Sequence, residues 1–154
     1  MVLNPGKCHY MPFGNVSKAD DIILNKKCIK PSTEQVLLGI TIDEKLNFKS
    51  HIGSLCRKAG AKLNALVSNE VTFLQRLVIF KSIIDFQFSY CPLICMFCSR
   101  TSNNLSNRIH ERALSLTYNN YFDTSDQLLL ISNESIIHKK NLSFFAIEIF
   151  KCMN

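Results

Sequence analysis

Residues 35–66, QVLLGITIDEKLNFKSHIGSLCRKAGAKLNAL, contain the change of hydrophobic periodicity that divides this chain. Before this stretch, apolar residues occur in short runs between turn-forming residues, which is typical of β-strands. From Phe48 the apolar residues follow helical spacing, which predicts a helix over 48–66. The expected inward stripe of that helix is Phe48, Ile52, Leu55, Cys56, Ala59, Leu63 and Leu66.

The region before Phe48 is expected to form a small antiparallel β unit over residues 7–42. Residues that favour turns occur at Asn25-Lys26 and at Pro31-Ser32. Pro12 cannot donate a ladder hydrogen bond, so the first strand is expected to lie at an edge. The predicted strands cover residues 7–13, 22–24, 27–30 and 35–42.

The region after the strands is expected to contain four to five helices, which makes the predicted fold class α+β. Thr72 and Gln75 have the spacing of a capping box, predicting a helix over 73–90 that Pro92 breaks or kinks. A short helix begins at Thr124 or Ser125, and longer ones cover 103–117 and 138–152. Ser102 is the predicted cap of the 103–117 helix. The inward residues are Leu105, Ile109, Ala113 and Leu116 in that helix, and Leu142, Phe145, Ala146, Ile149 and Phe150 in the last one.

Charge is distributed unevenly along the chain. Residues 1–62 contain 10 Lys+Arg and 5 Asp+Glu (+5), and residues 63–154 contain 8 and 7 (+1), which together give the net +6. A basic face suits a phosphate backbone, because neutralised phosphates release condensed counterions. A lysine-rich solvated surface has the same composition, so charge leaves both interpretations open. The 47% hydrophobic and 19% charged content argues against disorder.

No membrane span or secretory signal is predicted. Polar residues interrupt the most apolar stretch, 77–98, and the start lacks the basic and apolar regions of a signal peptide. We therefore expect an intracellular chain whose seven cysteines are reduced. Cys91, Cys95, Cys98 and His110 offer four metal ligands, but these thiols lie in a continuous apolar run. That setting favours buried thiols over a zinc site, and no metal or other cofactor is predicted.

Five sequence blocks follow one another along the chain. They are LNPGKCHYMPFG (3–14), QVLLGITID (35–43), SYCPLICMFCSRTSNN (89–104), IHERALSLTYNNY (109–121) and IHKKNLSFFAIEIFKCMN (137–154). In this order they resemble the C-terminal part of reverse transcriptases of non-LTR (LINE-type, jockey-like) retrotransposons. The resemblance covers nearly the whole chain. It implies palm-end β-hairpins over residues 1–46, and a helical thumb and post-thumb region over 47–154.

The resemblance also implies that the catalytic part of the polymerase is missing. Asp20-Asp21 after Ala19 imitates the metal-binding motif, but Lys18 stands where that family has an aromatic residue, and the pair follows the 3–14 block instead of preceding it. A solvated turn explains this pair better. The catalytic aspartates are expected upstream of Met1, so the chain is not expected to polymerise on its own.

The resemblance assigns candidate site residues at three places. Lys7 corresponds to a lysine near the phosphates of the incoming nucleotide, and Leu38 and Gly39 correspond to the primer grip. In the thumb-like helix, His51, Lys58 and Lys62 share one edge at helical spacing. The predicted contacts with the nucleic-acid backbone are Lys49, His51, Arg57, Lys58, Lys62, Arg108 and Arg112.

The functional prediction is a remnant of an RNA-directed DNA polymerase with residual template–primer binding at most. Its expected partner is an RNA–DNA or DNA duplex, bound weakly and without sequence preference. The alternative is a small helical protein-interaction module with no nucleic-acid role. In that case the partner is the missing palm or a second copy of the chain.

Overall fold

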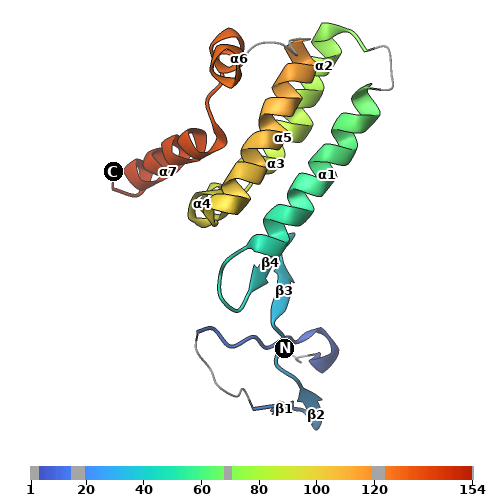
Figure 1. Cartoon of the computed structure of the whole chain (residues 1–154). Helices are drawn as coiled ribbons and strands as arrows, with labels where there is room; N and C mark the ends of the chain where they lie inside the picture. The colour runs from blue at the N-terminus through green and yellow to red at the C-terminus, as the bar shows by residue number, and fades with distance from the viewer. Residues whose placement is uncertain (1–3, 15–19, 68–70, 119–123, 154) are drawn as a thin grey trace. The chain divides into compact units, whose positions relative to one another are not determined.

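The computed structural model describes residues 4–14, 20–67, 71–118 and 124–153. The chain divides into two compact units, Met1–His51 and Ile52–Asn154, so the division falls five residues after the predicted boundary at 46/47. The predicted α+β class is confirmed, since two small antiparallel hairpins are followed by helices (Figure 1). The described residues contain six helices if the continuous run from Phe73 to Ser89 counts as one, against the four to five expected.

The first hairpin matches its predicted position. Strands β1 (Ile22–Leu24) and β2 (Lys27–Ile29) pair antiparallel, with Ile23 opposite Cys28. Asn25 and Lys26 connect them with φ angles of 49° and 66°. Positive φ at both central residues is the geometry of the type I′ turn, whose twist matches that of the flanking strands.

The second hairpin corrects the prediction of one strand over 35–42. Strands β3 (Glu34–Leu37) and β4 (Ile40–Asp43) are joined by Leu38 and Gly39, which have φ angles of 50° and 82°. Gly39 adopts this left-handed conformation without the clash that a Cβ causes. Leu38 adopts it at a cost, because side chains with a Cβ disfavour positive φ.

The predicted strand over 7–13 is wrong. Asn4 and Pro5 begin a short 3₁₀ helix, η1 (Pro5–Lys7), in which the Asn4 Oδ1 accepts a hydrogen bond from the Gly6 N–H at 2.9 Å. A capping asparagine followed by proline favours such a helical turn over a strand. The segment that follows forms one isolated parallel bridge, between Tyr10 and Pro31.

The helices begin and end close to the predicted positions. They are α1 (Lys49–Val67), α2 (Phe73–Ile79), α3 (Phe86–Ser89), α4 (Pro92–Phe97), α5 (Arg100–Tyr118), α6 (Ser125–Ser132) and α7 (Ile137–Met153). A π-helical segment, η2 (Phe80–Asp85), joins α2 to α3 without a break. The capping box is confirmed, because the Thr72 N–H donates to the Gln75 Oε1 at 3.0 Å and the Gln75 N–H donates to the Thr72 Oγ1 at 3.4 Å. The additional helix, α4, starts at the helix-breaking Pro92.

The inward stripe predicted for α1 is largely confirmed. Ile52, Cys56, Ala59 and Leu63 are buried, while Phe48 and Leu55 are half-buried. The side chain of Leu66 lies outside the described residues. Within the helical unit, the Ile52–Val67 part of α1 therefore buries a narrow apolar stripe, and its other described residues are half-buried or exposed.

The inward face of α5 differs from the prediction. Ala113 is buried, but Leu105 is 42% exposed and Ile109 and Leu116 are only half-buried. Small hydroxyl side chains can be buried because they bond to the preceding helical turn: Ser106 Oγ donates to Ser102 O at 3.2 Å, and Thr117 Oγ1 to Ala113 O at 2.8 Å. Ser99, rather than Ser102, caps the helix, since its Oγ accepts the Ser102 N–H at 3.3 Å. The buried residues of α5 are Ser102, Ser106, His110, Ala113, Leu114 and Thr117.

The inward face of α7 also differs from the prediction. Its buried residues are Ile137 and Asn141, near the start of the helix. Of the predicted stripe, Phe145 is half-buried, whereas Leu142, Ala146, Ile149 and Phe150 are exposed. Among the described residues, no helix is long and apolar enough to cross a membrane.

Candidate functional site

The predicted nucleic-acid contacts are divided between the two units. Lys7, Leu38, Gly39, Lys49 and His51 belong to Met1–His51, whereas Arg57, Lys58, Lys62, Arg108 and Arg112 belong to Ile52–Asn154. Lys7 ends η1 and is exposed, and Leu38 and Gly39 form the exposed β3–β4 turn.

The exposed basic side chains in the Ile52–Val67 part of α1 lie on two edges. Lys58 and Lys62 are four residues apart and share one edge of the helix. Arg57 lies on the opposite side of the buried stripe, on the edge that it shares with Asn64 seven residues later. Lys58 and Lys62 are thus a pair, and Arg57 is not part of it.

The two arginines of α5 are one helical turn apart and exposed, as the spacing predicted. The Arg112 Nη2 donates a hydrogen bond to the Asn64 Oδ1 at 2.8 Å. This contact brings Arg112 to the edge of α1 that carries Arg57. Arg108 and Arg112 therefore lie away from the edge that carries Lys58 and Lys62.

The start of α1 is fixed by two polar side chains of the first unit. Asp43 accepts hydrogen bonds from the N–H groups of Lys45, Asn47 and Phe48 at 3.1, 3.1 and 2.7 Å. Burial raises the pKa of this carboxyl, but the three hydrogen bonds outweigh burial and lower it below its ordinary value of 3.8. The His51 Nδ1 accepts the Thr41 N–H at 3.2 Å, so His51 connects α1 to β4.

A polar cluster, buried at His110 and half-buried at its other members, lies within the helical unit. Asp85 at the end of η2, His110 in the middle of α5 and Glu134 just after α6 place their ligand atoms within 4.8 Å of one another. The Lys140 Nζ from α7 donates to both carboxylates, to Asp85 Oδ1 at 2.7 Å and to Glu134 Oε2 at 2.8 Å. These two hydrogen bonds raise the pKa of Lys140 although burial lowers it. We call Asp85, His110, Glu134 and Lys140 the polar cluster.

His110 is the most deeply buried member of the polar cluster. Its side chain packs against Phe80 with ring centroids 5.5 Å apart, and the residue is 1% exposed. Its Nε2 is buried and has no hydrogen-bond partner among the described residues. Burial lowers the pKa of His110, so the imidazole is neutral at pH 7.

The polar cluster was not predicted from the sequence, in which His110 was a candidate metal ligand only together with the cysteines. Its three acidic and imidazole members are separated by 24 or more residues and share no local motif. The one available signal was that Asp85 and Lys140 are charged residues in helices rich in apolar residues. Such residues are rarely buried unless they are paired.

Of the three cysteines of the apolar run, Cys95 is buried, whereas Cys91 and Cys98 are half-buried. The Cys95 Sγ donates to Phe88 O at 3.6 Å, and the Cys98 Sγ donates to Cys95 O at 3.2 Å. Burial raises the pKa of the Cys95 thiol to about 12. A zinc ligand must be a thiolate, so these contacts favour the interpretation as buried thiols. Asp20 and Asp21 are exposed before β1, and Asp21 accepts the Cys28 thiol hydrogen at 3.1 Å.

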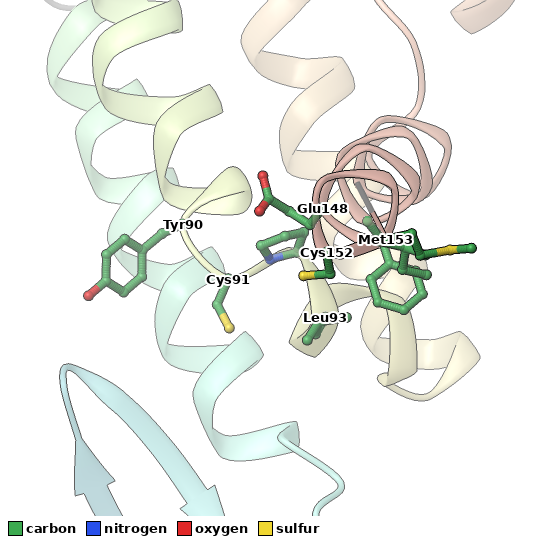
Figure 2. Close-up of a pocket in the computed structure, with 9 residues that line it drawn as sticks. Tyr90, Cys91, Leu93, Glu148, Cys152 and Met153 are labelled. Carbon is green, nitrogen blue, oxygen red and sulfur yellow. The ribbon is translucent and has the colours of Figure 1, made fainter.

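An apolar cavity of about 390 Å³ lies between the start of α4 and the end of α7. Figure 2 shows Cys91 and Leu93 on the α4 side and Glu148, Cys152 and Met153 on the α7 side. Pro92, Phe145 and Ile149 complete most of the lining. Apart from Glu148, the lining carries little that would orient a polar ligand.

In comparisons with known proteins, no protein-family model, no curated protein and no solved structure matches this chain.

Proposed function

We propose that the chain derives from the palm end, thumb and following helices of a non-LTR retrotransposon reverse transcriptase. In this proposal it retains weak, sequence-independent binding to nucleic-acid duplexes and has no polymerase activity of its own. The observation that carries the proposal is the order of the family-like blocks, with the basic helix α1 directly after the hairpin that contains Leu38 and Gly39.

The geometry of α1 supports a contact with the phosphate backbone. Lys58 and Lys62 are exposed on one edge, and four residues of helix separate them by about 6 Å along the axis. Phosphates of one DNA strand succeed each other every 3.4 Å or so along the duplex axis, so the two ammonium groups can reach different phosphates. Contacts of this kind position a duplex without reading its sequence.

The test is a measurement of how binding depends on salt. Fluorescence anisotropy of labelled B-form DNA and RNA–DNA duplexes gives the affinity at several salt concentrations. Changing Lys49, Lys58 and Lys62 together to Gln should weaken binding and flatten the slope of log K against log salt by roughly 0.9 for each lost phosphate contact on B-form DNA. Two duplexes of equal length and unrelated sequence should bind equally.

The matched control removes three other positive charges from the same unit as Lys49. Lys26, Lys27 and Lys30 are exposed on the first hairpin, and changing them to Gln lowers the net charge by the same amount. This variant should keep the wild-type salt slope. An equal loss of affinity in both variants would indicate nonspecific attraction and would end the thumb proposal.

A second candidate, a protein-interaction module, is favoured by the exposed apolar side chains of α6 and α7. Leu130, Ile131, Phe150 and Met153 are exposed, and Ile147 and Ile149 lie on the same helix as the last two. Exposed apolar side chains can pack against a partner, and large exposed apolar patches mark protein–protein interfaces. Concentration-dependent association in analytical ultracentrifugation, together with no measurable binding to duplexes, would favour this function over the first.

A further inference from the structure

The polar cluster contains charge and hydrogen-bonding capacity that its own members do not balance. Asp85 and Glu134 contribute two negative charges and Lys140 one positive charge, so a neutral His110 leaves a net charge of −1. The buried Nε2 of His110 has no hydrogen-bond partner in the described part of the chain. A buried polar atom without a partner destabilises the folded chain. Both features indicate that a cationic group fits among these side chains.

The backbone at Asp85 gives an independent indication. Asp85 is the last residue of the π-helical segment η2, which interrupts an otherwise regular α-helical run from Phe73 to Ser89. π-helical turns are rare and occur frequently at functional sites. Here the unusual turn carries one of the two carboxylates of the cluster.

We propose that Asp85, His110 and Glu134 form a Zn²⁺ site, in which the metal ion replaces the ammonium group of Lys140. One imidazole nitrogen and two carboxylate oxygens are ligands that zinc accepts, and a fourth position remains for water. A Zn²⁺ ion neutralises both negative charges of the two carboxylates, whereas the ammonium group of Lys140 neutralises only one. This inference is independent of whether the chain binds nucleic acid.

The geometry of the cluster allows this exchange. Tetrahedral zinc ligands lie about 2.0–2.2 Å from the metal and so about 3.4 Å from one another, which means that ligand atoms now within 4.8 Å of one another must approach by at most about 1.4 Å. The side chains of Lys140, Asp85 and Glu134 are 22%, 21% and 12% exposed, so the cluster is reachable from solvent. Lys140 has a long flexible side chain and can move outward while His110 stays in place.

Isothermal titration calorimetry with Zn²⁺ on the full chain tests the site. The wild-type chain should bind one equivalent. Asp85→Asn and Glu134→Gln keep the shape of each ligand and should weaken binding at least about 10-fold, whereas Lys140→Met removes the competing ammonium and should tighten it. Glu148→Gln is the matched control, because Glu148 also pairs with a lysine, Lys151 at 2.7 Å, but on the surface. This control should bind Zn²⁺ as the wild type does.

Cobalt(II) substitution separates this site from a site made of cysteines. Co²⁺ bound by Asp85, His110 and Glu134 should show weak visible bands and no intense thiolate-to-metal band in the near ultraviolet. Far-ultraviolet circular dichroism tests whether each variant is folded. If the Lys140→Met variant does not fold, the Zn²⁺ affinities of the Asp85→Asn and Glu134→Gln variants decide the test. The proposal is overturned by any one of three results: no Zn²⁺ bound by the wild type, wild-type affinity in both carboxylate variants, or weaker binding by a folded Lys140→Met variant.

Discussion

Asp43 shows how one side chain sets the start of a helix. It occupies the end of β4, and its two carboxylate oxygens accept three backbone N–H groups from the loop that leads into α1. These N–H groups precede the first helical hydrogen bonds, so without Asp43 they depend on water alone. The carboxylate form is the better acceptor, which is why its pKa is lowered.

Asp43→Asn should therefore reduce stability in a manner that depends on pH. A lowered pKa in the folded state means that the stabilisation is present above the unfolded value of 3.8 and is lost as pH falls through the lower folded value. An asparagine side chain has one acceptor oxygen where Asp43 has two, so it cannot accept all three N–H groups. We expect a loss of about 1 kcal/mol in the free energy of unfolding at pH 6, the net contribution of one hydrogen bond. The difference from wild type should shrink by pH 3.

Urea unfolding followed by circular dichroism at both pH values measures this difference. Asp20→Asn, which removes a charge from an exposed side chain before β1, controls for the change of net charge. A difference of equal size at pH 6 and pH 3 would contradict the assigned role of the Asp43 carboxylate.

At the scale of elements, substitution of two glycines by alanine should change the free energy of unfolding in opposite directions. Gly39 has a φ of 82° in the β3–β4 turn, so Gly39→Ala should lower the free energy of unfolding by about 1 kcal/mol. Gly53 lies inside α1, and a Cβ added there meets nothing within 4 Å, so Gly53→Ala should raise it by about 0.5–1 kcal/mol. Thermal unfolding of both variants provides the comparison, and shifts of the same sign would refute this explanation.

The ends of the helices and of the first hairpin could be predicted because they depend on residues that are close together in the sequence. The capping box of Thr72 and Gln75, the break at Pro92 and the first hairpin all involve residues within a few positions of one another. The pattern of apolar residues did not predict the β3–β4 turn, because the turn requires a positive φ at a leucine, Leu38, which such patterns do not signal. Only the resemblance implied a hairpin at Leu38 and Gly39. Local patterns thus identified where helices lie more reliably than where short strands end.

The faces of the helices were less predictable than their ends. In α5, Ser102, Ser106 and Thr117 are buried because each is small, and Ser106 and Thr117 bond to their own helix, so periodicity of apolar residues does not find them. In α7 only some of the apolar residues are buried against the rest of the helical unit, and several remain exposed. Which residues are buried depends on neighbouring elements, and a single helix does not contain that information.

At the scale of the whole molecule, the two sets of candidate residues differ in how they were found. The basic residues of α1 and α5 were predicted from composition and from the resemblance. This was possible because each residue lies on a single helix, and helical spacing is enough to predict that its side chain is exposed. The polar cluster joins η2, α5, the segment after α6 and α7, and only the folded arrangement brings Asp85, His110 and Glu134 together. Sites of this second kind need long-range packing that one sequence does not reveal.

The π-helical segment η2 is a place where the chain should tolerate the deletion of one residue. A π turn contains about one residue more than an α turn, so deleting exposed Lys81 should convert η2 to α-helix and keep α2 and α3 in register. Deleting exposed Arg108 from α5 instead rotates all following residues about 100° and takes Ala113 and Leu114 out of the core. Circular dichroism and thermal unfolding should show a folded Lys81 deletion and an unfolded Arg108 deletion. The same fold would then be encoded equally well by a chain one residue shorter.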